Sequence, residues 1–600
     1  MNALIKTNQL SYRLNKRLLF QTYDIFCICT SDKYFKNGAY IIDAPLLNSA
    51  VCSVLFMSGK EIFVLMKQSD TNMWLLKDTL SKADGADRIT LSRMSFDEVK
   101  DDVILQLLLN GLGNYESSML KFNNLTGHLY CFHPNWLVRG RKGEADVIFK
   151  VPCLEMKITS DFRLNMEVHT FTSELLRNKI EFKKRRFEEY PKYVFSAYNT
   201  LRRKLKDDTG HAFIMRQTKD AKTEIPFLDI QNIDRFNQSK MGILATVIEN
   251  FNDKFSDIAH LAFADIAQYA SVDYTHAVAK ESKQVILDIL NDKPIKIIDC
   301  IGDKYSKVFC KEIYDLLFSK YGIKAVCGKR VSHKHLNIRV IHNAAYYIDC
   351  EDPHKAFDDV AVQHITFEDF SECSEFAIST VVHELIIKDD LKNQQISLFD
   401  WKALNIVEDI DFGVEVIDEQ GEKYIFMTVH PDGSFNISEQ ILNLFEMNRY
   451  YQCVEIFENA KIDSEKIRGI IRDSSGNINI IKDTGWFTIP EVHSIKTELA
   501  SGNTKLRGKE KRDELLSSCL DIKMFRENDA EYYFVGTIGN GMRQLINRAA
   551  NIRKIEPFEA SALIFEKMLP LMNITFVHNG QLTVMPFPFK YLREYVKLKQ

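Results

Sequence analysis

The sequence predicts a multidomain α/β protein, on the strength of three observations. The chain has 600 residues, which is too long for one hydrophobic core and typical of about three to five domains. An apolar run at 295–301 is followed by a helical pattern and further short strands, the alternation expected of a parallel sheet covered by helices. From Asp411 onward, three alternating strand patterns separated by short turns indicate an antiparallel sheet.

The composition is that of an ordinary globular protein, with 45% hydrophobic and 27% charged residues. The net charge of −4 neither indicates nor excludes nucleic-acid binding, because a binding channel needs local charge. The 12 cysteines include no CxxC pair, so we expect reduced thiols and neither a zinc ribbon nor a disulfide framework. We find no signal-peptide pattern and no apolar run near the roughly 20 residues of a membrane span. We therefore expect a cytoplasmic protein with no membrane partner.

Residues 1–145 predict an α+β domain. Strand patterns lie at 25–30 and 50–67, the second being a hairpin that turns at 58–60. The apolar spacing at 97–109 is that of an amphipathic helix.

The next two units are a strand-rich segment and a helical one. Residues 146–230 begin with two strand patterns, at 146–158 and 162–172. Residues 231–290 are predicted to be a helical connecting segment, because the apolar spacing from Asp234 onward is helical.

A basic stretch with interleaved aromatic residues occupies 177–206. It could line a nucleic-acid channel, with cations on phosphates. The same pattern is equally typical of a helix that has its charged face in solvent and an apolar stripe in the core. The aromatic residues are better explained as core residues than as surfaces for base stacking. The cations assigned to the channel are Lys183, Lys184, Arg185, Arg186, Arg202 and Arg203.

Residues 291–400 predict a Rossmann-like domain. A buried strand at 295–301 turns at Gly302 into a helix over 305–321, which Gly322 ends, and strands follow at 323–327 and 338–342. A strand that feeds a helix N-terminus is a natural anion site. The residues assigned to this site are Lys304, Tyr305, Ser306, Lys307, Lys311, Lys329, Arg330 and Lys334.

Residues 401–600 predict an antiparallel sheet with helices. Strands at 412–417, 423–430 and 434–438 precede a helix at 439–460 and a strand at 467–472. This is the element order of an RNase H-like domain. Further predictions are a strand at 532–535, helices near 542–550 and 557–568, and a Pro-x-Pro turn that feeds a last helix.

Two short motifs carry a family resemblance. They are the strand Phe412-Gly413-Val414-Glu415-Val416 and the C-terminal Pro586-Phe587-Pro588-Phe589-Lys590-Tyr591 segment. With the layout of 291–600, they resemble the MID–PIWI lobe of Argonaute proteins, and 164–172 is similar to an N-lobe strand of some prokaryotic Argonautes. The resemblance implies a MID-like domain at 291–400 and a PIWI-like domain at 401–600. It also implies an N-lobe and first linker at 146–230, with PAZ reduced or absent, and a second linker at 231–290.

The resemblance also implies an inactive PIWI domain. Slicing Argonautes hold two divalent ions on a tetrad of side chains. Here the tetrad positions fall on Glu415, whose carboxylate lies one methylene further out than aspartate, on Asp473, and on Arg593. A guanidinium offers no lone pair to a metal, so we expect no catalytic residues and no metal at this place.

The MID pocket of the family binds the guide 5′-phosphate, and a Mg²⁺ ion there is the one cofactor we expect. The family's glutamine falls near Val326, so the usual residue set is not intact. An N-lobe combined with an inactive PIWI domain resembles the DdmE proteins, the Argonaute-like components of the DdmDE plasmid-defence system; PIWI-RE proteins are a neighbouring possibility. The resemblance implies a nucleic-acid guide, DNA rather than RNA, a target in invading plasmid or phage DNA, and a helicase–nuclease partner.

Alternative functions stay open from the sequence. Asp146 with Glu155 and Lys157 fits the loose D…(D/E)xK pattern of metal-dependent nucleases, as it fits a strand with alternating charges. A residual PIWI site would be a second route to cleavage, and a purely structural subunit is a third reading. His128, Cys131 and His133 are a weak candidate metal site that lacks a clear fourth ligand.

Overall fold

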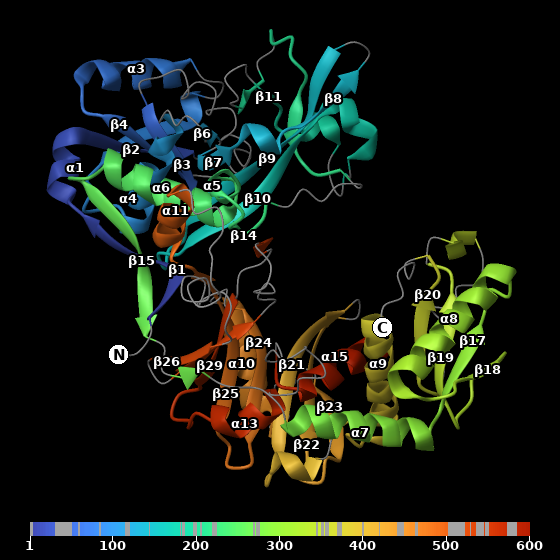
Figure 1. Cartoon of the computed structure of the whole chain (residues 1–600). Helices are drawn as coiled ribbons and strands as arrows, with labels where there is room; N and C mark the ends of the chain where they lie inside the picture. Colours follow the sequence, from blue (N-terminus) through green and yellow to red (C-terminus); the bar gives the residue numbers. More distant parts are fainter. Residues whose placement is uncertain are drawn as a thin grey trace.

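The computed structural model contains two lobes of helices and strands (Figure 1). The elements from α1 to α6 lie in the upper lobe together with α11, and most later elements lie in the lower lobe. The structure describes residues 4–30, 51–57, 61–82, 86–114, 121–125, 127–142, 145–180, 182, 186–195, 201–204, 207–218, 225–267, 270–271, 277–343, 346–349, 353, 359–368, 375–398, 401–418, 421–440, 449–462, 466–501, 523–527, 530–535, 545–546, 551–572 and 585–599.

The first domain is built on a four-stranded sheet in the order β3-β4-β2-β5. Its strands are β2 (Tyr23–Thr30), β3 (Val51–Met57), β4 (Glu61–Lys67) and β5 (Ile89–Met94), and its helices are α1 (Lys16–Thr22), α3 (Asp70–Ser81) and α4 (Asp101–Asn110). The antiparallel β3–β4 pairing confirms the predicted hairpin, whose turn at 58–60 lies outside the described residues. The predicted amphipathic helix is α4, which is buried from Val103 to Asn110.

A second, eight-stranded sheet completes the upper lobe. Its strands are β6 (Lys121–Leu125), β7 (His128–Phe132), β8 (Val138–Lys142), β9 (Ala145–Ile158), β10 (Leu164–Ser173), β11 (Tyr193–Phe195), β12 (Leu201–Arg203) and β13 (Phe213–Met215). The long strands β9 and β10 confirm the two predicted strand patterns and pair antiparallel in continuous register. The described part of the basic stretch contains no α-helix, since it forms short 3₁₀ helices at Glu174–Lys179 and Phe187–Glu189 and the short strands β11 and β12.

The connecting segment is only partly helical. It contains β14 (Leu228–Asp229), α5 (Ile233–Asn237), α6 (Lys240–Lys254), β15 (Ala259–Ala267), β16 (Ala270–Ser271) and α7 (Ala277–Asp292). The prediction of helix throughout was wrong at β15, which pairs antiparallel with the first strand, β1 (Leu4–Leu14). Pairing with β1 therefore decides the conformation of the segment that forms β15. Strand β1 also pairs with β25 of the lower lobe.

A four-stranded parallel sheet in the order β18-β17-β19-β20 forms the next unit. Its strands are β17 (Ile295–Asp299), β18 (Val326–Gly328), β19 (Leu336–Ile341) and β20 (Val362–Thr366), and its long helices are α8 (Lys304–Tyr321) and α9 (Glu375–Asn393). The parallel pairings agree with the predicted alternation of strands and helices. Gly322 ends α8 in the left-handed conformation, with φ of 69°.

The lower lobe is built around a large sheet with the path β16-β26-β27-β29-β25-β24-β21-β22-β23. Its strands are β21 (Ile410–Asp418), β22 (Gly421–Val429), β23 (Phe435–Gln440), β24 (Ile467–Asp473), β25 (Ile478–Ile489), β26 (Lys523–Glu527), β27 (Ala530–Val535) and β29 (Asn551–Pro557). The predicted strand sequence is present, but β24 pairs antiparallel with β21. The predicted order of three antiparallel strands, a helix and a further strand is therefore confirmed as an order of elements.

Helices cover both faces of this sheet. Helix α10 (Tyr451–Ile462) packs on one face, and α13 (Phe565–Met572) and α15 (Pro588–Lys599) pack on the other. Helix α11 (Val492–Ala500) instead packs against α5 and α6 of the upper lobe. The helix predicted at 439–460 was wrong at Glu439 and Gln440, which belong to β23, and α10 begins at Tyr451; 441–448 lie outside the described residues. The helix predicted near 542–550 was wrong at Leu545–Ile546, which is strand β28. The helix predicted at 557–568 begins only with α13, after β29.

The Pro-x-Pro segment leads into α15, which packs into the main core of the lower lobe. The hydroxyl of Tyr591 donates a hydrogen bond to Asp390 of α9 at 2.6 Å, which ties the end of the chain to the parallel-sheet unit. None of the helices in the described part of the chain has the length and apolar character that crossing a bilayer requires.

Candidate nucleic-acid interface

A cleft of about 680 Å³ lies between the β9–β10 turn of the upper lobe and side chains of the strands β24, β25, β27 and β29. Two acids line it, Asp161 and Asp483. Five cationic side chains outnumber them: Arg163, Lys466, Arg468, Lys482 and Lys554. Such a local cationic surplus attracts nucleic-acid phosphates even though the whole chain is slightly acidic.

A backbone irregularity in β25 forms the cleft wall. The register of β25 against β29 shifts between Asp483 and Trp486, and Gly485 there has φ of +69°. A side chain on Gly485 would meet the guanidinium of Arg163, whose Nη1 atom lies 1.6 Å from an ideal Cβ position. Glycine is therefore required for two reasons, the positive φ and the close approach of Arg163 from the other lobe.

Ion pairs neutralise the acids in and beside the cleft. Asp483 accepts hydrogen bonds from Arg468 at 2.5 Å and from Arg553 at 2.8 Å. Burial works to raise the pKa of Asp483, but the two arginines outweigh burial and lower it. Glu556 is likewise held by Lys482 at 2.8 Å and by Lys554 at 2.5 Å. Because these carboxylates stay paired, the cations stay fixed along the wall.

The cleft also contains an aromatic pair. The rings of Trp486 and Tyr532 stack with centroids 5.3 Å apart and planes 4° from parallel. Aromatic faces beside a cationic track are the usual arrangement for binding single strands, since each base offers a face for stacking. The sequence alone does not indicate this site, because Arg163 lies about 300 positions before the other cations. The one local signal is Gly485, which stands between a polar residue and a tryptophan.

At the start of α8, the chain's own carboxylates occupy the predicted anion site. Asp303 accepts hydrogen bonds from the amides of Tyr305 at 2.8 Å and Ser306 at 2.6 Å. Asp299 accepts from the amides of Ile301 and Gly302 at 3.0 and 2.9 Å, and from the hydroxyl of Ser306 at 2.8 Å. The hydrogen bonds that the backbone amides of Ser306 and Tyr305 donate to Asp303 lower the pKa of its carboxyl group. A phosphate at this place would compete with two anions for the same donors.

The structure gathers only part of the predicted guide-end residues. Lys304, Tyr305 and Lys307 are exposed on the first turn of α8, and Lys304 lies over the Tyr305 ring at 4.7 Å. Lys311 lies roughly 10 Å further along the helix, two turns on. Lys329 and Arg330 follow β18 at the same edge of the sheet, whereas Lys334 lies beside the start of β19 at the opposite edge.

A histidine that the sequence did not indicate lies at the carboxyl edge of the sheet. His342 follows β19, and its ring stacks on Tyr346 at a centroid distance of 3.9 Å. Its charge interacts with Asp303 and helps to lower the pKa of that carboxyl. The carboxyl ends of β17 and β19 form the topological switch point of the sheet, where α/β domains usually bind ligands.

In the large sheet, Glu415 and Asp473 are each held by a lysine. Lys461 Nζ lies 2.7–2.8 Å from Glu415, Glu422 and Glu458. Asp473 accepts hydrogen bonds from Asn477 and lies 2.9 Å from Lys567 Nζ. Burial works to raise the pKa of Asp473, but Asn477 and Lys567 outweigh burial and lower it.

The structure does not bring the three tetrad positions together. Asp473 faces Ile410 across the β21–β24 pair, so it shares a sheet face with Ile410. Glu415 is five residues further along β21, roughly 17 Å away, and its odd spacing puts it on the other face. Arg593 is exposed on α15, where its Nε lies 3.8 Å from a carboxylate oxygen of Glu594.

A third carboxylate, Asp411, was missed from the sequence. It is buried on the same sheet face as Glu415 and accepts hydrogen bonds from Thr428 at 2.6 Å and from Arg449. Arg472 lies 3.5 Å away. Two guanidinium groups thus occupy the position beside this acid that a metal ion would need.

The nuclease pattern is not assembled either. Asp146 is exposed and pairs with Arg141 at 3.5 Å, whereas Glu155 is nine residues further along the same strand, roughly 30 Å away. Asp146, Glu155 and Lys157 therefore cannot share one metal ion. Cys131 is fully buried, His133 accepts a hydrogen bond from the Asn135 amide, and the side chain of His128 lies outside the described part.

The predicted channel cations are only partly described. Lys183, Lys184 and Arg185 lie outside the described residues. Arg186 is exposed, and Arg202 pairs with Asp208 in a bidentate contact. Arg203 lies beside it on β12, across from Tyr193.

Comparisons with known proteins give a distant likeness of layout. No protein-family model and no curated protein matches the chain. Among solved structures, it is similar to Marinitoga piezophila Argonaute with a 5′-OH guide RNA and target DNA, at 12% identity and a TM-score of 0.39, covering 98% of this chain and 97% of that one. The same Argonaute with guide RNA alone gives 11% identity, a TM-score of 0.37 and the same coverage. Drosophila Piwi gives 10% identity and a TM-score of 0.37, over 99% and 97%. These values do not place the chain in a family.

Proposed function

We propose that this protein is an Argonaute-like, nucleic-acid-guided DNA-binding protein that does not itself cut its target. The observation that carries the proposal is the cleft between the two lobes, where five cations and a stacked aromatic pair line about 680 Å³ of space. In a guided binder, base pairing reads the sequence while the protein contacts the backbone. A surface of lysines, arginines and aromatic faces, without a fixed hydrogen-bonding pattern for one base, suits that task.

The proposal that cleavage is left to a partner rests on the carboxylates of the large sheet. Two-metal hydrolysis needs acids that converge within a few ångströms, with ions about 3.5–4 Å apart. Glu415 and Asp473 lie on opposite faces of the sheet, and Lys461 and Lys567 neutralise them. In this proposal a helicase–nuclease is recruited to DNA that the guided complex has recognised, and the target is plasmid or phage DNA.

The guide in this proposal is DNA, and its 5′ end lies at the carboxyl edge of the parallel sheet. The exposed side chains of Lys304 and Lys307, in the first turn of α8, are the cations of this helix that lie at that edge of the sheet. Asp299 and Asp303 would repel a 5′-phosphate unless a cation lay between them and the guide. Carboxylates are suitable ligands for Mg²⁺, so these two residues would hold the ion, which would offset the repulsion of the phosphate.

The test is to purify the protein from its host and to extract and end-label whatever nucleic acid accompanies it. We expect short strands of narrow length that DNase removes and RNase does not. RNase-sensitive strands would retain the guided binder and reject the DNA guide. A preparation without nucleic acid, which also fails to take up synthetic 5′-phosphorylated or 5′-hydroxyl guides, would overturn the proposal.

A second test concerns cleavage by the isolated chain. Loaded with a guide, it is expected to bind a complementary strand and to leave it intact in Mg²⁺ or Mn²⁺. Cutting that disappears in Asp473→Ala would show an active metal site in the lower lobe and would contradict the proposed division of labour.

A further inference from the structure

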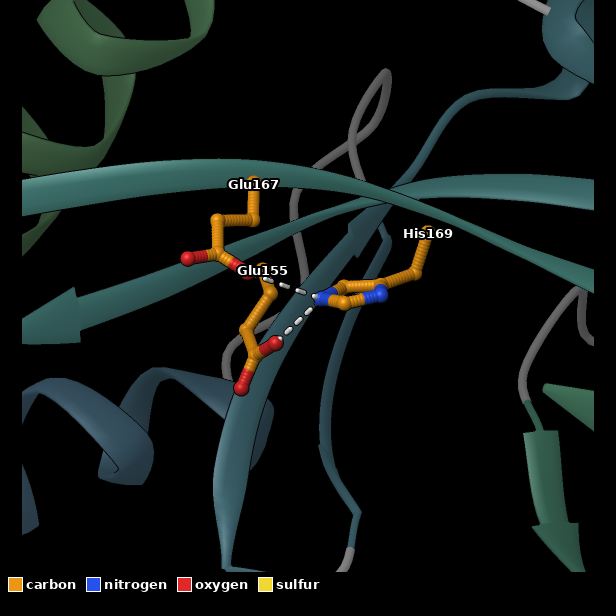
Figure 2. Close-up of side chains that lie close together, drawn as sticks. All are labelled: Glu155, Glu167 and His169. Carbon is orange, nitrogen blue, oxygen red and sulfur yellow. Dashed lines mark ion pairs between the residues drawn. The ribbon is translucent and has the colours of Figure 1, made fainter. Parts of the chain in front are cut away.

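Three potential metal ligands meet on the β9–β10 pair of the upper lobe. Figure 2 shows the side chains of Glu155, Glu167 and His169 turned toward one another. One donor atom from each lies within 4.8 Å of the donors of the other two. His169 Nε2 is 2.5 Å from Glu155 Oε2 and 3.6 Å from Glu167 Oε2.

Strand register produces this convergence. Glu155 and Glu167 are direct partners across the antiparallel pair, and His169 is partnered with Cys153, two residues before Glu155. All three side chains therefore project from the same face of the sheet. They stand on long, paired strands beside the apolar cluster that contains Tyr130 and Phe171, so their positions are fixed by regular structure rather than by a loop.

The two opposed carboxylates of Glu155 and Glu167 would be stabilised by a cation between them. Like charges directly opposite each other destabilise a β-pair, and here two carboxylates are opposed. Glu155 has a side chain only 13% exposed, so water screens it weakly, whereas Glu167 is 71% exposed. A protonated His169 offsets one of the two negative charges. A divalent ion would offset both.

The spacing suits one ion. Nitrogen and oxygen ligands bind Zn²⁺ at about 2.0–2.2 Å, so two donors of one ion lie roughly 3.0–3.5 Å apart. The separations of 2.5 and 3.6 Å bracket that range, and small side-chain rotations would adjust them. One imidazole with two carboxylates favours a first-row transition ion such as Zn²⁺ or Mn²⁺ over Ca²⁺ or Mg²⁺, which prefer oxygen alone.

We infer that Glu155, Glu167 and His169 form a site for one divalent transition-metal ion. The exposed side of Glu167 leaves coordination positions open to water or to a further ligand, as in zinc sites with three protein ligands. The site uses Glu155 without Asp146 or Lys157, so it differs from the nuclease pattern in the sequence. It is independent of the proposed guided binding.

The test is metal binding by the full chain after chelator treatment, with ZnCl₂ in titration calorimetry and with Co²⁺ followed by its visible absorption. We expect one Zn²⁺ equivalent that His169→Ala and Glu167→Gln each remove or weaken at least tenfold. Glu167→Gln changes an exposed side chain, so it keeps the test valid even where His169→Ala disturbs folding. The unfolding temperature of each metal-free variant shows whether that variant is folded.

The matched control is His211→Ala. His211 lies 3.6 Å from Glu174 in an exposed histidine–glutamate pair, and no third metal-ligating side chain joins this pair among the residues that the structure describes. Zn²⁺ binding should be unchanged in this variant. A wild-type chain that binds neither Zn²⁺ nor Mn²⁺ would overturn the inference. So would an equivalent of metal that either Glu167→Gln or His169→Ala binds with the affinity of the wild type.

Discussion

The guanidinium of Arg163, in the turn before β10, donates a hydrogen bond at 2.5 Å to the carbonyl oxygen of Thr484, 321 residues later in the chain. This contact joins the upper lobe to β25 of the lower lobe. Asn8 reinforces it, since its amide nitrogen lies 3.4 Å from the Gly485 carbonyl and its oxygen accepts from the Phe487 amide at 3.0 Å. The cleft wall is thus assembled from three distant segments.

The first prediction concerns Gly485. In Gly485→Ala, the new Cβ would displace the guanidinium of Arg163, and the alanine would have to adopt φ of +69°. Such strain and the lost contact should lower the free energy of unfolding by about 1–3 kcal/mol. Chemical denaturation measures the change. Gly476→Ala is the matched control, because Gly476 has φ of +87° but nothing within 4 Å of its ideal Cβ.

The two variants separate strain from contact. Both carry the cost of a positive φ, so the excess loss in Gly485→Ala reports the Arg163 contact alone. Equal losses in the two variants would contradict a role for Arg163 in joining the lobes.

The second prediction concerns Lys466, an exposed cation of the cleft. Lys466→Ala should weaken nucleic-acid binding at every sequence tested, because it removes a phosphate contact rather than a base contact. The slope of log K against log salt should become shallower by about 0.7–0.9, the value for one phosphate. Fluorescence anisotropy across a salt series measures this slope.

Lys82→Ala is the control for general charge. Lys82 is exposed on the upper lobe, where it pairs with Asp78 at 2.6 Å. Its removal changes the net charge by the same amount as Lys466→Ala and should leave the salt slope unchanged. If both variants change the slope equally, the cleft has no special part in binding.

The sequence predicts the elements well where one local pattern decides the conformation. Strands β9 and β17 are examples, because the apolar residues of each are sufficient to indicate a strand. Strand β15 was missed because its conformation depends on pairing with β1, more than 240 residues earlier. The α8 start was located correctly, but no local pattern shows that Asp299 would accept hydrogen bonds from the amides of Ile301 and Gly302 just before the helix.

The relation between the acids of the large sheet could not be predicted for a different reason. The distance between Glu415 and Asp473 depends on the direction of β24 and on which face each residue occupies. A linear motif fixes neither quantity. The cleft is harder still, because Arg163, Lys466 and Lys554 carry no common local signal and meet only through the lobe contact.

The third prediction concerns Lys567. Its ammonium group contacts Asp473 at 2.9 Å and Glu408 at 2.6 Å. Lys567→Met leaves Asp473 buried without its cation, which should lower the free energy of unfolding at pH 7 by about 1–3 kcal/mol. Urea denaturation measures the loss, with Lys82→Met as the exposed control.

The pH dependence of that loss follows from the lowered pKa of Asp473. A carboxyl with a depressed folded pKa stabilises the fold above its unfolded value, near 3.9, and loses that contribution as pH falls through the folded pKa. The difference between wild type and Lys567→Met should therefore be full at pH 7 and shrink below about pH 4. A difference that stays constant over this range would show that Lys567 acts by packing.

The fourth prediction concerns Asp390, which is buried where α9 meets α15. It accepts hydrogen bonds from Tyr591 at 2.6 Å and from the amide and hydroxyl of Ser397 at 2.9 and 2.5 Å. Burial raises the pKa of Asp390 to about 7, against the opposing effect of these donors. The folded state then binds a proton that the unfolded state has already lost between roughly pH 4 and pH 7.

The extra proton on Asp390 in the folded state fixes the direction in which stability changes with pH. Because the folded state binds more protons in this window, the contribution of Asp390 to stability falls as pH rises, by at most about 1.4 kcal/mol per pH unit. Asp390→Asn cannot titrate and should lack the decline, so the stability difference between variant and wild type should shift in favour of the variant from pH 5 to pH 7. Asp87→Asn, at an exposed site, is the control. Parallel stability profiles for wild type and Asp390→Asn would mean that Asp390 is ionised throughout, with Tyr591 and Ser397 sufficient to hold a buried charge.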